Sequence, residues 1–265
     1  MESALYFIAH HRLYFIGKSR ENPYIECMSN FNALRARSMD GSDAGVSEHL
    51  LDPGVGAPGV RPIVVVPIRS LAGNQRSRIA AHLLGLDVGD RYLRFGYAAS
   101  DEQVGRYAAG LDFEHDEVFG VFNRKLALIA FAHLAYPRDK AFCDRAEFGV
   151  SVTKANRGRG YGARLFERAA MHARNDGITQ LYIHALSENT AMLKIARDAG
   201  AVVTRDGSES DALLCLAPAT LDSHVSEIVQ EQFAQADYRM KQQARQFSAF
   251  LGGLRDSVAL PRDGR

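Results

Sequence analysis

The sequence has little net charge, no closely spaced cysteines and no long apolar run. Its 32 Lys and Arg residues nearly balance its 31 Asp and Glu residues, which leaves a formal net charge of +1. A chain without a basic excess offers no general field to nucleic acid, so nucleic-acid binding is not expected. No apolar run approaches the roughly 20 residues that a membrane-spanning helix needs, so no membrane association is expected either.

The three cysteines, Cys27, Cys143 and Cys215, stand far apart in the chain. None has a partner at metal-ligand spacing and the histidines do not cluster as ligands, so no metal site is expected. An odd number of isolated cysteines is typical of reduced thiols in a cytoplasmic protein. The first residues show no basic leader and no plausible cleavage site, so they do not indicate a signal peptide. These features together predict a cytoplasmic protein.

The most informative stretch runs from residue 147 to residue 170 and contains a short strand, a basic loop and the start of an amphipathic helix. The loop carries three glycines and two arginines, namely Arg157, Gly158, Arg159, Gly160 and Gly162. Glycine allows a positive φ and a close approach of main-chain N–H groups to a ligand. The first N–H groups of the helix that follows are unpaired, which favours a bound anion. The stretch therefore predicts a site for a phosphate or pyrophosphate.

Two other interpretations of this loop stay open from the residues alone. The first is a plain glycine-rich turn between strand and helix, with two solvated arginines. The second is a dinucleotide-binding fingerprint, because Gly158, Gly160 and Ala163 match G-x-G-x-x-A and Glu188 follows the next strand. Residues 153–157 weaken this second interpretation, since they separate the strand from the glycines where that fingerprint requires an immediate turn.

The hexapeptide Arg157-Gly-Arg-Gly-Tyr-Gly resembles the Arg/Gln-x-x-Gly-x-Gly/Ala signature of the GNAT family of acetyl-CoA-dependent N-acyltransferases. Residues 181–200 resemble the strand, the asparagine and the glycine-terminated helix that follow in that family. The combined pattern looks most like the GNAT domains of bacterial acyltransferases whose acceptors include protein lysines. The resemblance implies acetyl-CoA as cosubstrate, no metal, and a small amine or a protein lysine as acceptor. The alternative is a non-catalytic acyl-CoA-binding or scaffold protein with the same fold.

Hydrophobic periodicity and turn residues divide the chain into four parts. We predict an N-terminal hairpin-like extension (1–38), a linker (39–61), an acetyltransferase domain (62–218) and a C-terminal helical tail (219–265). The domain reads β-α-α-β-β-β-α-β-α-β-β, with residues 91–97 as a connection between its first two helices. This is the order of the GNAT fold, an α/β (α+β) fold with a mixed, mostly antiparallel central sheet flanked by helices.

The resemblance also implies the residues that hold the cosubstrate. The diphosphate would bind the loop from Arg157 to Gly162, including Tyr161. The main-chain groups of Val150 and Val152 would hold the pantetheine arm as an added strand, and one of their N–H groups would polarise the thioester carbonyl. Asn189 matches the family asparagine that touches this arm, and it is equally suited to cap the helix that it precedes.

Glu147 is the residue that we would name as general base. Strand alternation puts its side chain on the face opposite Phe148, and the pattern Ala-Glu-Phe-x-Val matches family strands that carry such a carboxylate. Partial burial would raise the pKa of a carboxylate there towards a value useful for proton transfer. The alternative is a surface salt bridge with Arg145 or Lys154.

Two further roles are left without a certain residue. Many family members place a proton-donating tyrosine seven residues after the asparagine, but that position is Ala196 here. His184, Tyr182 or water could protonate the thiolate instead, or the protein could bind acyl-CoA without turnover. The arginines of residues 91–97 could receive a carboxylate-bearing acceptor or be solvated.

The C-terminal tail shows apolar residues at steps of three and four, which predicts one long amphipathic helix. The apolar positions are Val225, Ile228, Val229, Phe233, Ala236, Met240, Ala244, Phe247 and Leu251. This apolar stripe could pack on the domain of its own chain or form a homodimer with a second subunit, and the sequence favours neither.

Overall fold

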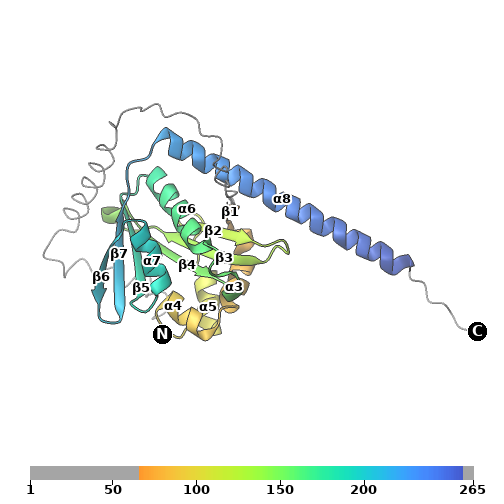
Figure 1. Ribbon diagram of the computed structural model, residues 1–265, viewed down its shortest axis with the longest axis horizontal. Coiled ribbons are helices and arrows are strands. Elements are labelled where there is room, and N and C mark those ends of the chain that lie inside the picture. The colour runs from red at the N-terminus through yellow and green to blue at the C-terminus, as the bar shows by residue number, and fades with distance from the viewer. Residues whose placement is uncertain (1–65, 259–265) are drawn as a thin grey trace, which may run out of the picture. The chain divides into compact units, whose positions relative to one another are not determined.

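The computed structural model describes residues 66–258, and it describes every side chain in that range except those of residue 140 and residues 252–258. The predicted extension (1–38) and linker (39–61) lie outside this range. The strands are β1 (Ile68–Ser70), β2 (Glu117–Phe122), β3 (Leu128–Ala135), β4 (Arg145–Val152), β5 (Gln180–Leu186), β6 (Val202–Asp206) and β7 (Glu209–Cys215). The α-helices are α3 (Arg76–Leu84), α4 (Val88–Phe95), α5 (Asp101–Ala109), α6 (Tyr161–Asn175), α7 (Thr190–Asp198) and α8 (Leu221–Val258) (Figure 1).

The seven strands form one sheet in the order β1-β2-β3-β4-β5-β7-β6. Every neighbouring pair is antiparallel except β4 and β5, which run parallel. This confirms the predicted mixed, mostly antiparallel sheet flanked by helices. The single parallel pair matters for function, because β4 comes before the glycine loop in the chain and β5 comes after it.

Each face of the sheet is covered by its own apolar cluster. On one face Leu165 and Phe166 of α6 and Leu193 of α7 pack against Phe148 of β4, with the Phe148 and Phe166 ring centroids 5.1 Å apart. The cluster on the other face joins α3, α4 and α5 to β2 and β3 through Ile79, Leu83, Phe95, Val104, Val118 and Phe131. Because strand side chains alternate between faces, each residue of β4 contacts only one of these two layers.

Helix α4 lies where the sequence predicted only a connection, and this is a correction. Its N-cap Asp87 accepts a hydrogen bond from the main-chain N–H of Asp90 at 2.8 Å, and Gly96 ends it with a φ of 77°. Both end signals are present in the sequence, but the eight residues of α4 bury only two side chains, Asp90 and Phe95. A helix of only eight residues that buries so few side chains is hard to detect from hydrophobic pattern alone.

The long helix α8 is held to the domain by a polar network. Glu227 accepts hydrogen bonds from Arg168 at 2.6 Å, His172 at 2.5 Å and Asn175 at 2.6 Å. Burial lowers the pKa of His172, but hydrogen bonds with Asp176 and Glu227 outweigh burial and raise this pKa to about 9. Burial raises the pKa of Glu227, but hydrogen bonds led by that from His172 lower it to about 2. The Glu227–His172 pair is therefore charged on both sides at neutral pH.

The same polar face continues along α8 through Glu231 on Ser70, Tyr238 beneath Arg69, and Lys241 on the carbonyl of Phe122. The apolar stripe lies on the other side of the helix. Its large members Val225, Ile228, Phe233, Met240 and Phe247 have exposed fractions between 47% and 63%. Of the two alternatives, packing of the stripe on its own domain is therefore wrong for the part of the chain that the structure describes.

No helix among the described residues is long and apolar enough to cross a membrane. Cys143 is an exposed free thiol, whereas Cys215 is disulfide-bonded. This corrects the expectation of reduced thiols at Cys215, and the cytoplasmic location stays a prediction.

Candidate functional site

The glycine loop forms an open cradle at the start of α6. Gly158 and Gly160 have φ angles of 72° and 77°, which glycine adopts at little cost. Gly160 is the N-cap of α6 and makes no side-chain capping bond, and the first turn contains no acidic residue. The first helical N–H with a main-chain partner is that of Arg164, bonded to the carbonyl of Gly160. Within residues 66–258 the N–H groups of residues 161–163 therefore have no main-chain partner, and such N–H groups at the start of a helix attract anions.

The space beside Gly158 and Gly160 in the cradle is open. A Cβ built on Gly158 would meet no atom within 4 Å, and one on Gly160 would meet only Arg164 Nε at 4.0 Å. Behind the cradle, a Cβ on Gly162 would lie 3.1 Å from Ile195 of α7. Tyr161 is partly buried against the core below. The outer two glycines thus leave room for a ligand, while Gly162 lets α6 pack closely on its neighbour.

The two loop arginines differ in their surroundings. Arg157 forms an ion pair with Asp90 of α4 at 2.5 Å, and its Nε donates to the carbonyl of Val152 at 3.2 Å. Arg159 is exposed and forms no hydrogen bond or ion pair with any residue in the described range. Arg159 is thus the loop cation that is available to an anion, whereas Arg157 also ties the loop to α4 and β4.

Strands β4 and β5 separate immediately before this cradle. They pair only from Arg145 opposite Gln180 to Glu147 opposite Tyr182. Beyond that point β4 pairs with β3 alone, up to Val152, and β5 pairs with β7. Residues 148–152 therefore present an unpaired strand edge towards the gap between the two strands.

Main-chain alternation shows which residues use that edge. The N–H of Thr153 donates to the carbonyl of Ile129 at 3.0 Å, so this is a hydrogen-bonded pair of the β3–β4 ladder. Such pairs recur every second residue in an antiparallel ladder. Ser151 therefore bonds towards β3, while the main-chain groups of Val150 and Val152 point to the open edge. An extended ligand could pair with them as an added strand.

Residues Glu147, Gly149 and Ser151 face the layer formed by α3, α4 and α5. Ser151 is bound by His82 of α3, whose Nε2 lies 2.8 Å from the serine Oγ. Its Nδ1 lies 3.0 Å from the carbonyl of Leu128, so Nδ1 carries the proton and Nε2 accepts one from Ser151. Burial lowers the pKa of His82, which keeps this imidazole neutral. The pair anchors β4 to α3.

Glu147 lies at the last β4–β5 pair, where the strands begin to separate, and it is partly exposed. Its charge raises the pKa of Tyr107 on α5, after burial as the main cause, and contributes to the raised pKa of His184 on β5. The carboxylate therefore lies between α5 and β5, at the start of the open edge. Neither Arg145 nor Lys154 forms an ion pair with it: Arg145 pairs with Asp144, and Lys154 with Asp87. The surface salt bridge that the sequence left open is thus not formed.

A sequence model of the acetyltransferase (GNAT) family matches residues 80–201, which contain the cradle, the open strand edge and Glu147. This domain belongs to the GNAT family. The predicted fold is confirmed with it, since the seven-stranded sheet and its helices have the GNAT arrangement. No curated protein matches the sequence at a significant level.

Solved structures with similar folds include the GNAT domain of PAT from S. lividans, at 24% identity and a TM-score of 0.49, covering 58% of this chain and 95% of that one. The protein yncA from Salmonella typhimurium, solved with acetyl-CoA, is 15% identical with a TM-score of 0.46 over 58% of this chain and 96% of its own. A phosphinothricin acetyltransferase from Sinorhizobium meliloti, in complex with AcCoA, is 10% identical with a TM-score of 0.46 over 58% and 89%.

Asn189 caps helix α7 of the GNAT domain, as one of its two interpretations predicted. Its Oδ1 accepts from the main-chain N–H of Met192 at 3.2 Å. Its Nδ2 donates to the carbonyl of Leu93 at 3.4 Å, which links α7 to α4. A contact between Asn189 and a bound pantetheine arm stays a prediction.

The absent tyrosine is not replaced by a residue at the same place. Ala196 is fully buried in the core cluster. His184 lies on the face of Glu147, and its Nδ1 is 2.5 Å from Asp211. The hydrogen bond to Asp211 is the largest cause that raises the pKa of His184. Tyr182 donates its hydroxyl proton to Gln180. Of the two candidates, Tyr182 already uses its hydroxyl proton in the bond to Gln180, whereas Nε2 of His184 lies 3.7 Å from the carboxylate of Glu209.

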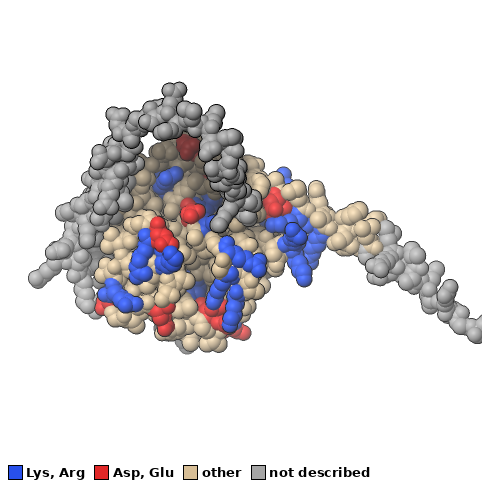
Figure 2. All heavy atoms as spheres, in the orientation of Figure 1, with Lys and Arg blue, Asp and Glu red and all other residues tan. Residues whose placement is uncertain are grey.

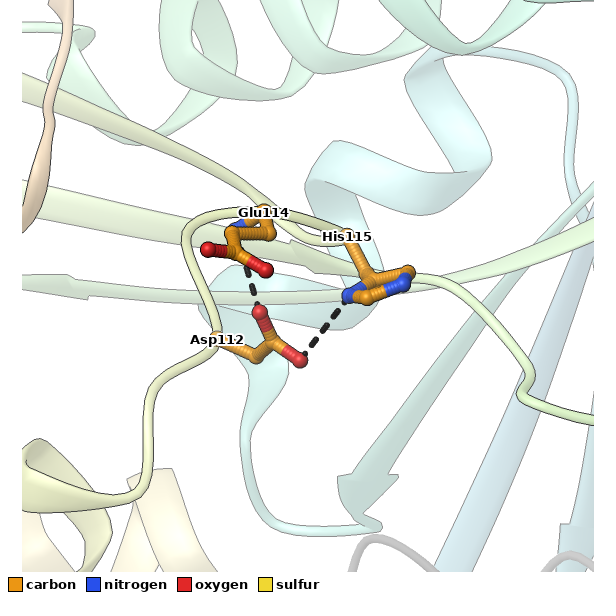
Figure 3. A group of neighbouring side chains, drawn as sticks. All are labelled: Asp112, Glu114 and His115. Carbon is orange, nitrogen blue, oxygen red and sulfur yellow. Dashed lines mark hydrogen bonds and ion pairs between the residues drawn. The ribbon is translucent and has the colours of Figure 1, made fainter.

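Asp112, Glu114 and His115 form an acidic group in the turn between α5 and β2 (Figure 3). Asp112 accepts from the main-chain N–H of Glu114 at 3.0 Å and lies 3.1 Å from His115 Nδ1. Arg138 also donates to the Asp112 carboxylate at 2.5 Å. These contacts are those of a side-chain-stabilised turn with a paired cation, and they do not point to a ligand.

Proposed function

We propose that this protein is an N-acetyltransferase that moves an acetyl group from acetyl-CoA to a primary amine. One observation carries the proposal: the open edge of β4 is followed, after a short turn and the glycine loop, by the uncapped N-terminus of α6. A CoA diphosphate fits the cradle, because the open glycines and the unpaired N–H groups face it and the first turn of α6 bears no carboxylate. The pantetheine arm would pair with Val150 and Val152, and no metal is required.

The proposed reaction uses both the open main-chain edge of β4 and the side chain of Glu147. The lone pair of a neutral amine attacks the thioester carbonyl carbon, a C–N bond forms, the C–S bond breaks, and CoA leaves as the thiolate. A main-chain N–H of Val150 or Val152 would stabilise the developing oxyanion. Glu147 accepts the proton that the amine loses, and the thiolate takes a proton from His184 or from water. The products are the N-acetyl amine and free CoA.

A non-catalytic acyl-CoA-binding protein is the second candidate, and the buried Ala196 favours it because a proton donor is missing there. Titration calorimetry with acetyl-CoA, and with NADP for comparison, tests the shared binding step. We expect binding of acetyl-CoA only. Release of free CoA is then followed with a panel of small amines and lysine-containing peptides. Absence of any CoA or acetyl-CoA binding would overturn both candidates, and binding without release would leave the non-catalytic one.

A further inference from the structure

Arg94 of α4 lies flat against the strand that carries the candidate base. A Cβ built on Gly149 would come within 2.8 Å of Arg94 Nη2 and 2.9 Å of its Cζ. Any other residue at position 149 would therefore displace the guanidinium, so glycine here makes room for Arg94. Gly149 is two residues after Glu147 on the same face of β4, which places the two positions roughly 7 Å apart along the strand.

The guanidinium is held by neutral groups only. Nη2 donates to the hydroxyl of Tyr107 at 2.9 Å, and that hydroxyl lies 2.9 Å from His133 Nδ1. His133 is fixed in turn by Asp116, 3.1 Å from its Nε2. These contacts, from Asp116 through His133 and Tyr107, fix the orientation of the Arg94 guanidinium. No carboxylate among the described residues lies within 4 Å of the Arg94 nitrogens.

Arg94 keeps unused hydrogen-bonding capacity. Nε is buried and has no hydrogen-bond partner in the described part of the chain. Nη1 has no partner there either, yet it is not among the buried atoms, so solvent or a ligand can reach it. A half-buried cation without a counter-charge is costly for a fold. A carboxylate bound to the guanidinium in bidentate geometry would supply both the missing negative charge and the missing hydrogen-bond acceptors.

We infer that Arg94 binds a carboxylate of the acceptor, so that the acceptor is a small amine carrying a carboxylate, such as an amino acid. This inference rests on the proposed function and names its substrate class. A small molecule is favoured over a folded protein because the guanidinium lies beneath α4 and α5 rather than on the outer surface. The carboxylate at Arg94 would direct the amine towards Glu147 and the open edge of β4.

Matched pairs of amines test this inference. Lysine is compared with cadaverine, and histidine with histamine, because each pair differs only in the carboxylate. For the wild type we expect kcat/KM to be higher for the amino acid of at least one pair. In Arg94→Gln that preference should fall by about 10–100-fold, the range of a charged hydrogen bond. The kcat/KM for the decarboxylated amine and the KM for acetyl-CoA should change little.

A second variant separates position from charge. Gly149→Ala keeps Arg94 but pushes its guanidinium off β4, so it should lose the same preference. Arg106→Gln, an exposed arginine of α5, is the matched control and should keep it. Equal use of both members of each pair by an active wild type, or preference retained in Arg94→Gln, would overturn the inference. Absence of acetyl transfer to every amine would instead count against the proposed function.

The apolar stripe of α8 carries a second, independent inference. Three pairs of apolar residues lie at equal distances on either side of Ala236, namely Leu221 and Leu251, Val225 and Phe247, and Ile228 and Ala244. Every one of these residues is exposed. In an antiparallel pair of such helices centred on Ala236, each of these residues would meet the apolar residue of its pair on the second copy.

The charged residues of α8 are used on its other face. Glu227, Glu231 and Lys241 bind the domain of their own chain. Basic side chains gather where α8 passes the β2–β3 hairpin (Figure 2), where Arg245 donates to the carbonyl of Lys125. These contacts hold the polar face of α8 and leave the apolar stripe on its exposed side. We propose that the stripe is covered by α8 of a second copy, as an antiparallel two-helix interface.

Sedimentation analysis of the full chain tests this arrangement. The wild type should have twice the monomer mass of 29.2 kDa. Val225→Glu and Phe247→Lys should each give monomers, and the double variant should recover the dimer, because residue 225 meets residue 247 of the partner. Gln242→Glu, on the same helix outside the stripe, is the control. A monomeric wild type, or a double variant that stays monomeric, would overturn the proposal.

Discussion

Glu147→Gln is expected to lower kcat for acetyl transfer by at least ~100-fold, the contribution of a well-placed general base. Glutamine keeps the shape of the side chain but cannot accept the proton of the attacking amine. Affinity for acetyl-CoA should stay within about a factor of two, because Glu147 lies at the start of the open edge and not in the cradle. Steady-state CoA release and calorimetric titration measure the two quantities separately.

The pH profile gives a second readout for Glu147. In the wild type, kcat/KM should fall at low pH as the base becomes protonated, and the fall due to Glu147 should be absent from the residual activity of Glu147→Gln. Glu167→Gln removes an exposed carboxylate from α6 and should behave like the wild type. Full turnover by Glu147→Gln would show that another group, such as water alone, takes the amine proton.

Gly160→Asp is expected to weaken acetyl-CoA binding by at least ~100-fold, since it combines like-charge repulsion with the loss of several charged hydrogen bonds. The new carboxylate would lie beside the unpaired N–H groups at the start of α6 and would compete with the diphosphate for them. It would also repel the diphosphate directly. The measurement is calorimetric titration, with the melting temperature as the check on folding.

Gly177→Asp is the matched control for Gly160→Asp. Gly177 follows the other end of α6 with a φ of 82°, and a Cβ there would meet nothing within 4 Å. Both substitutions impose a similar left-handed strain of roughly 1–2 kcal/mol, so a simple loss of stability would appear in both. Equal affinities for acetyl-CoA in the two variants would mean that the cradle is not the diphosphate site.

Local signals were sufficient for the part of the site that lies within one continuous stretch. The strand, the glycine loop and the helix start that the sequence predicted between residues 147 and 170 are present as β4, the loop and α6, because alternation and a glycine-rich loop depend on neighbouring residues only. The cap formed by Asn189 is equally local. From such local features the sequence predicted the GNAT family, its sheet, the phosphate-binding loop and the position of Glu147 on its strand.

The tertiary structure decided what lies against these elements. Arg94 reaches Gly149 across 55 positions of sequence, and no pattern within α4 indicates that contact. In α8 the sequence shows which side is apolar, but a polar network centred on Glu227 holds the other side to the domain. Periodicity shows the chemistry of each face of a helix. Which face of α8 meets the domain depends on groups such as the buried Arg168, and only the folded chain brings Arg168 opposite α8.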